Sequence, residues 1–211
     1  MNNPETAEFT SLSIHHSSRL HLPHQTWVIE KKLSERSQPM TQQDVTDGLG
    51  ITFAAAKFLC HPKETPSKKA FMRIYLQIPI SGTQCQSPQI RREQAAKPQP
   101  HVELTALKAL KRFECDVVPD HLAYQEGKQG EGSIVPGGYI SYIVWNKVHG
   151  EPLNAEEFWE QDPKSRQAIR DKFREAFPKL KKFGYLPRMS TMSKIIYDKA
   201  TGDMYALSII E

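Results

Sequence analysis

The sequence predicts an α+β fold in which an antiparallel sheet precedes a helical part that ends in a hairpin. Three observations predict it. Strand-like apolar runs separated by turn signals fill the first half of the 211-residue chain. One amphipathic helix pattern interrupts these runs, and a long helical pattern comes before two final short apolar runs. A chain of this length can bury a core without crosslinks.

Three predicted strands of the first half form an antiparallel meander. Trp27–Glu30 opens the first strand, ITFAAAKFLC over Ile51–Cys60 forms the second, and AFMRIYLQIPI over Ala70–Ile80 forms the third. These runs are apolar, and a turn signal at Asp47-Gly48 and the charged, proline-bearing segment HPKETPSKK separate them. The polar, histidine-rich residues 1–26 predict a flexible arm.

The middle of the chain contains one helix between strands. Ser81–Pro100 is rich in proline and glutamine and predicts a mobile loop. A helix is predicted over His101–Phe113, because the leucines in this segment recur every three residues. A short strand at Leu122–Tyr124 and a turn-rich connection lead to Tyr139–Val148, YISYIVWNKV, the strongest strand pattern of the chain.

Capping signals locate the last elements. Asn154, with Glu157 three positions later, predicts the start of a helix, and Asp162-Pro163 predicts the start of a longer one. Gly184 is expected to end that helix. The segment Ser193–Ile210 then has the pattern of a hairpin around a turn at residues 200–203.

The composition gives no indication of a nucleic-acid-binding, metal-binding or membrane protein. The net charge of +4 is mild, and basic and acidic residues are interspersed along the chain. Proteins that bind phosphate backbones usually show a concentrated basic stripe, so nucleic acid is not expected as a partner. The three cysteines have no metal-ligand spacing, and no apolar run is long enough to cross a bilayer. We therefore expect a protein of the cytoplasm or nucleus that does not enter membranes.

Four motifs occur in a characteristic order. A basic residue, Arg73, stands in the third strand, and Glu103 stands in the helix that follows. Tyr142–Gly150, YIVWNKVHG, is followed by Pro152-Leu153, and the hairpin SKIIYDKATGDMYALSII closes the chain. Together these motifs resemble the protein-kinase-like fold, in a divergent form similar to a family of small fungal kinase-like proteins.

The resemblance implies positions for a nucleotide site. Arg73 stands where kinases carry a strand lysine, and Glu103 resembles the helix glutamate that pairs with it. Val144, Trp145 and Asn146 belong to the segment similar to the kinase hinge. ATP, with or without Mg²⁺, is the ligand that this implies. A structural ion pair between Arg73 and Glu103 is the alternative, and it is favoured.

Departures from the kinase pattern imply that catalysis is lost. Aligned on Ser193, the hairpin puts Leu186 and Arg188 where the family has its catalytic His and Asp. Ser208 takes the place of a metal-binding Asp, and Ser193 that of a metal-binding Asn. Mg²⁺ in phosphoryl-transfer sites is held chiefly by carboxylate and phosphate oxygens. The resemblance therefore implies a degenerate, pseudokinase-like member.

Two carboxylates keep an enzymatic alternative open. Asp198 and Asp203 lie in and beside the hairpin turn, and with Ser208 they could hold a displaced metal. Plain turn chemistry is the favoured interpretation, because Asp in turns bonds to its own backbone. The alternatives to a non-catalytic binding or regulatory module are thus a small-molecule phosphotransferase with displaced metal ligands and a pure protein-interaction scaffold.

The resemblance also predicts domain boundaries and partners. It divides the chain into an arm at 1–26, a kinase-like amino-terminal lobe with hinge at 27–148, and a shortened carboxy-terminal part of two helices and a hairpin at 149–211. The lobe is expected to be a sheet with one packed helix. A protein partner or a second copy of the chain is expected to cover apolar surface on the shortened part. Trp159 is expected in the core, and the alternative is that Trp159 and Phe158 lie at a partner surface.

Overall fold

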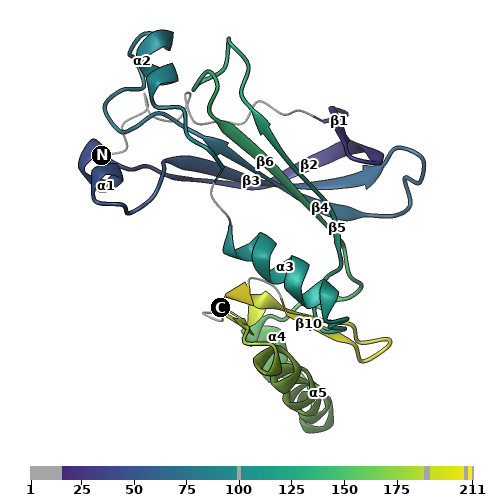
Figure 1. The fold of residues 1–211 in the computed structure, drawn as a ribbon. Coiled ribbons are helices and arrows are strands. Elements are labelled where there is room, and N and C mark those ends of the chain that lie inside the picture. The colour runs from purple at the N-terminus through teal and green to yellow at the C-terminus, as the bar shows by residue number, and fades with distance from the viewer. Residues whose placement is uncertain (1–15, 99–100, 188–190, 207–208, 211) are drawn as a thin grey trace. The chain divides into compact units, whose positions relative to one another are not determined.

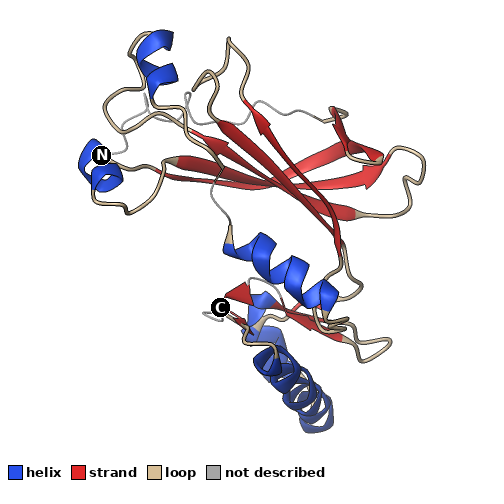
Figure 2. Ribbon diagram, in the orientation of Figure 1, coloured by secondary structure: helices blue, strands red, loops and turns tan. Residues whose placement is uncertain are grey.

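The computed structural model describes residues 16–98, 101–187, 191–206 and 209–210, and its chain forms two compact units (Figure 1). The first unit combines the described parts of residues 1–99 with residues 122–145, and the second combines those of 100–121 and 146–211. Helices and strands both occur in each unit (Figure 2). The predicted α+β class, with an antiparallel sheet, is confirmed.

A six-stranded sheet in the order β1-β2-β3-β4-β6-β5 forms the framework of the first unit. Successive strands pair antiparallel from β1 to β4. The apolar runs predicted at 51–60, 70–80 and 139–148 all lie in this sheet. Its strands are β1 (Arg19–Leu22), β2 (Gln25–Gln38), β3 (Phe53–Pro62), β4 (Ala70–Gln77), β5 (His121–Lys128) and β6 (Tyr139–Asn146).

Strand β1 lies inside the segment that the sequence predicted as an arm. It pairs with β2 from Arg19 opposite Val28 to Leu22 opposite Gln25. Leu22 is buried in the core of the unit, so burial of this leucine outweighs the polar composition around it. A strand therefore occupies residues 19–22 of the predicted arm, whereas residues 1–15 lie outside the described part of the chain.

The sheet has two distinct faces because side chains alternate along a strand. One face holds a core of buried aliphatic and aromatic side chains, which includes Phe58 and Met72. Val144 belongs to this core. The opposite face carries Lys57, Phe71, Arg73 and Trp145, whose side chains contact one another. Neighbours along one strand, such as Val144 and Trp145, thus lie on different faces.

The connections of the first unit are more ordered than the sequence indicated. Residues 81–98, predicted as a mobile loop, contain helix α2 (Pro88–Glu93) with Ser87 at its N-cap, and α1 (Gln42–Thr46) follows β2. Gln77 ties the segment after α2 to the sheet. Its side chain donates to Gln94 O at 2.6 Å and accepts from Ala96 N at 2.9 Å. The interpretation as a mobile loop is therefore wrong for this segment.

A buried glutamine organises the connection between β5 and β6. Gln129, which is 7% exposed, donates from Nε2 to Gln77 O at 2.8 Å and to Tyr139 O at 3.2 Å, and its Oε1 accepts from Val135 N at 3.1 Å. Buried polar groups need such partners. These hydrogen bonds order the turn-rich connection between the two strands.

Three helices and short strands make up the second unit. One sheet has three strands in the order β10-β9-β7, so β7, which follows β6 in the chain, pairs with strand β9 of the hairpin. A separate two-stranded sheet pairs β11 with β8. None of the described helices has the length and apolar composition that crossing a bilayer requires. The elements are α3 (Val102–Arg112), β7 (Glu151–Pro152), α4 (Ala155–Glu160), α5 (Pro163–Lys182), β8 (Leu186–Pro187), a 3-10 turn (Met192–Lys194), β9 (Ile195–Tyr197), β10 (Met204–Ala206) and β11 (Ile209–Ile210).

Helices α4 and α5 begin at the capping residues that the sequence predicted. Asn154 accepts hydrogen bonds from Glu156 N and Glu157 N at the start of α4, and Asp162 accepts from Lys164 N and Ser165 N at the start of α5. Gly184 follows α5 with a φ of +80°, a conformation that glycine adopts without strain. The predicted caps, helix end and hairpin are confirmed.

Helix α3 contributes to the core of the second unit. Ala106 and Leu110 are fully buried in a cluster with Phe158 of α4 and Ile169 of α5. The hairpin adds Ile195 and Met204 to this cluster. The apolar stripe predicted for this helix is therefore confirmed, and part of it packs against the carboxy-terminal helices.

Candidate functional site: a polar pocket beside the hairpin

The residues that follow β6, from Gly150 to Leu153, pack directly on the hairpin. β7 pairs antiparallel with β9, with Glu151 opposite Tyr197 and Pro152 opposite Ile196, and Leu153 N donates to Ile195 O at 2.8 Å. Gly150 makes this approach possible. It has a φ of +95°, and a Cβ at this position would lie 2.6 Å from the carbonyl carbon and oxygen of Tyr197. Only glycine fits such a contact.

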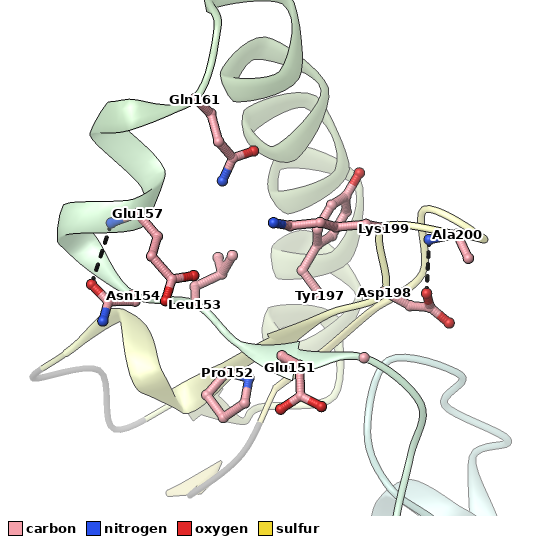
Figure 3. Close-up of a pocket in the computed structure, with 11 residues that line it drawn as sticks. Glu151, Pro152, Leu153, Asn154, Glu157, Gln161, Tyr197, Asp198, Lys199 and Ala200 are labelled. Atoms are coloured by element: carbon pink, nitrogen blue, oxygen red, sulfur yellow. Dashed lines mark hydrogen bonds between the residues drawn. The ribbon is translucent and has the colours of Figure 1, made fainter.

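A pocket of about 370 Å³ lies beside this pairing. Its walls come from residues 150–154, from α4 and from the start of the hairpin turn. Figure 3 shows the side chains of Glu157, Gln161 and Lys199 around one open space, with the Tyr197 ring at its side. A carboxylate, an amide and an ammonium group can together bind a polar ligand that carries both donors and acceptors.

Asp198 and Asp203 hold the hairpin turn. Asp198 Oδ1 accepts from Ala200 N at 2.8 Å, and its carboxylate points away from the pocket centre in Figure 3. Asp203 Oδ2 accepts from the Thr201 hydroxyl at 2.8 Å, and the turn closes with Asp198 N donating to Asp203 O at 2.9 Å. This is the turn chemistry expected of aspartate.

No cluster of side chains suited to binding a metal ion forms among the described residues. Among them, no three His, Cys, Asp or Glu side chains lie close enough together to hold an ion. Ser208 and Arg188, which the sequence aligned with family metal-binding and catalytic positions, lie outside the described residues. A metal role for Asp198, Asp203 and Ser208 stays a prediction.

A second polar group lies on the sheet of the first unit. Arg73 on β4 stands opposite Lys57 on β3 in the strand register. The guanidinium carbon of Arg73 lies 5.4 Å from the centre of the Trp145 ring, and Lys57 Nζ lies 3.9 Å from the centre of the Phe71 ring. Two cations held on aromatic rings can bind phosphate oxygens through charge-assisted hydrogen bonds.

The structure brings only some of the predicted nucleotide residues together. Arg73 and Trp145 share one face of the sheet, whereas Val144 is buried in the core on the other face. The Asn146 side chain accepts from Asp120 N at 2.7 Å, so it holds the neighbouring strand. Glu103 lies in the first turn of α3, in the second unit, and its pairing with Arg73 stays a prediction.

Gln161 and Lys199 were not predicted as site residues from the sequence, and Glu157 was predicted only to cap a helix. Glu157 lies in the first turn of α4, and Gln161 is the extended residue that follows the helix, so no helical spacing joins the two. Lys199 could not have been found, because its place depends on how the hairpin pairs with β7.

Comparison with known proteins does not assign a family. The chain matches no protein-family model and no curated protein. Similar solved structures include the Cydia pomonella granulovirus kinase PK-1, at 10% identity over 85% of this chain and 49% of that one, with a TM-score of 0.46. Another is WbdD, at 13% identity over 91% of this chain and 35% of that one, with a TM-score of 0.46. The chain thus spans half or less of either protein, and both TM-scores are too low to carry an assignment.

Proposed function

We propose that this protein is a non-catalytic, kinase-like binding or regulatory module. The observation that carries the proposal is the state of the two hairpin carboxylates. Asp198 and Asp203 accept hydrogen bonds within their own turn, and Asp198 is directed away from the polar pocket. Positioning of Mg²⁺ for phosphoryl transfer needs carboxylates that face the nucleotide.

The proposed nucleotide contacts centre on Arg73. Its guanidinium lies against the Trp145 ring beside Lys57, which supports a role in holding phosphate. Glu103 would orient Arg73, and Asn146 would fix the end of the hinge-like strand. Val144 would support the site from the core without contacting the ligand, because its side chain is fully buried and its strand is paired on both sides. The division into a lobe at 27–148 and a part at 149–211 belongs to this proposal, whereas residues 19–22 of the predicted arm at 1–26 form strand β1.

Thermal unfolding with ATP tests the binding step. A ligand that binds only the folded state at a hundredfold excess over its Kd stabilises that state by about 2.7 kcal/mol. For a chain of this size the midpoint then rises by about 5–10 °C. We expect the same rise with and without Mg²⁺. Arg73→Met should abolish it, and Arg36→Met, which changes an exposed arginine of β2, should leave it intact.

The alternatives predict different results. A rise that requires Mg²⁺ and is lost in Asp198→Asn would support the phosphotransferase with displaced metal ligands. The absence of any rise would remove nucleotide binding and leave the interaction scaffold. An equal rise in wild type and Arg73→Met would contradict the assignment of Arg73.

A further inference from the structure

A second cavity of the carboxy-terminal unit is apolar and rimmed by arginines. It is a groove of about 410 Å³ between α4, α5 and the hairpin. We call it the arginine-rimmed groove. Arg170 and Arg174, one turn apart on α5, line it together with apolar side chains. The apolar lining includes Leu153, Phe158, Ile169, Phe173, Met192 and Met204.

Positive charge is concentrated on the helix that borders this groove. Helix α5 contains eight Lys or Arg and two acidic residues, a net charge of +6, whereas the whole chain carries only +4. Arg166, Arg170 and Arg174 follow one another at intervals of four, so they form a stripe along one face. Arg170 contacts the rings of Phe158 and Trp159, with its guanidinium carbon 5.2 and 5.8 Å from their centres. Among the described residues it forms no ion pair.

Helix α4, which also borders the groove, is acidic rather than basic. Residues 154–162 contain four acidic and no basic side chains. Glu156, Trp159 and Glu160 share a face of α4, since they are three and four positions apart. Trp159 is 63% exposed, whereas its neighbour Phe158 is 6% exposed. An indole held out to solvent between two carboxylates is chemically complementary to an apolar groove between two guanidinium groups.

We propose that two copies of this chain associate through these surfaces, with the Trp159 ring of each copy entering the arginine-rimmed groove of the other. Trp159 stands at the rim of its own groove, because its ring lies near Arg166 and Arg170. A patch that contains both the projecting group and its receptor can pair with itself about a two-fold axis. Glu156 and Glu160 of one copy then face Arg170 and Arg174 of the other.

A second copy explains the groove better than nucleic acid does. Phosphate backbones need a basic stripe, but they do not fill a groove lined by leucine, isoleucine and methionine. The acidic-aromatic segment that fits the groove is present in the chain itself. The part of the Trp159 indole that is still exposed would bury on the order of 150 Å² on entering such a pocket. Two symmetric insertions would form the centre of an interface of ordinary size.

Sedimentation velocity of the full chain across a concentration series tests the proposal. We expect a monomer–dimer equilibrium, and Trp159→Ala should raise its Kd at least tenfold. Leu49→Ala is the matched control, because Leu49 is 64% exposed and lies in the other unit. It should leave the Kd unchanged. Circular dichroism should show both variants folded, since neither side chain is buried.

A charge exchange gives a second, independent readout. Glu160→Arg and Arg170→Glu should each weaken the dimer, because like charges then face one another across the interface. The double variant E160R/R170E should recover most of the lost affinity, since opposite charges meet again. A chain that stays monomeric up to about 100 µM, where a micromolar dimer would be nearly complete, overturns the proposal. A dimer that persists in Trp159→Ala overturns it as well.

Discussion

Replacing Gly150 by alanine should disrupt the packing of residues 150–153 on the hairpin. At a φ of +95° an L side chain is strained, and the added Cβ would lie 2.6 Å from Tyr197 C and O and 2.7 Å from Asp198 N. These atoms belong to the backbone of the hairpin, so they cannot move aside as a flexible side chain would. Strain of this kind costs about 1–3 kcal/mol and overpacking about 1–3 kcal/mol more, which gives about 2–6 kcal/mol in total.

Gly202→Ala is the matched control for this experiment. Gly202 belongs to the same hairpin and has a φ of +76°, but an added Cβ there meets no atom within 4 Å. The control should cost only about 1 kcal/mol, the conformational term alone. Urea unfolding measures both losses. Hydrogen exchange of the Leu153 amide, which donates to Ile195 O, reports on the pairing itself.

The result that would refute this reasoning is equal destabilisation by the two substitutions. Unchanged exchange of the Leu153 amide in Gly150→Ala would refute it too. Either outcome would mean that residues 150–153 do not pack on the hairpin backbone as closely as the structure shows. The polar pocket beside them would then lose its wall.

Three further predictions concern stability. Gln129→Leu should cost about 2–4 kcal/mol in urea unfolding, because it leaves Gln77 O, Tyr139 O and Val135 N without the partners they now have; a cost below about 1 kcal/mol would contradict this. Burial lowers the pKa of His121 to about 4, helped by nearby Lys108 and Lys111, so the unfolded chain takes up this proton first as the pH falls below 6.5. Between pH 7.5 and 4.5 the wild type should therefore lose about 1–2 kcal/mol more stability than His121→Gln. This loss is smaller than the full pKa shift would give, because the ring is partly solvated. Equal losses in the two proteins would exclude His121 as the cause. Asp162→Ala should cost about 1 kcal/mol through loss of the α5 cap, measured by thermal unfolding against Asp171→Ala, an exposed control in the same helix that should be nearly neutral.

Features fixed by a few neighbouring residues could be predicted from the sequence. Asn154 and Asp162 cap their helices because their side chains reach backbone N–H groups two and three residues ahead. Gly184 ends α5 for a similarly local reason. The main strands were also predictable, since their apolar runs are long and bounded by turn signals.

Features that depend on distant partners could not be predicted. The order in residues 81–98 comes from bonds of Gln77 and Gln94 to residues well separated in sequence. β1 depends on the burial of Leu22 against later strands. The polar pocket exists because Gly150 meets the hairpin nearly fifty residues later, and no local pattern reveals that contact.

The central claim is that the chain binds without transferring phosphate, and its most direct test is phosphate release from γ-labelled ATP with Mg²⁺ present. The account predicts that wild type and Asp198→Asn release phosphate at the same rate as a sample without protein. A wild-type rate above that background that falls to background in a folded Asp198→Asn variant would contradict the account. It would make the hairpin carboxylate a metal ligand in a working phosphotransferase.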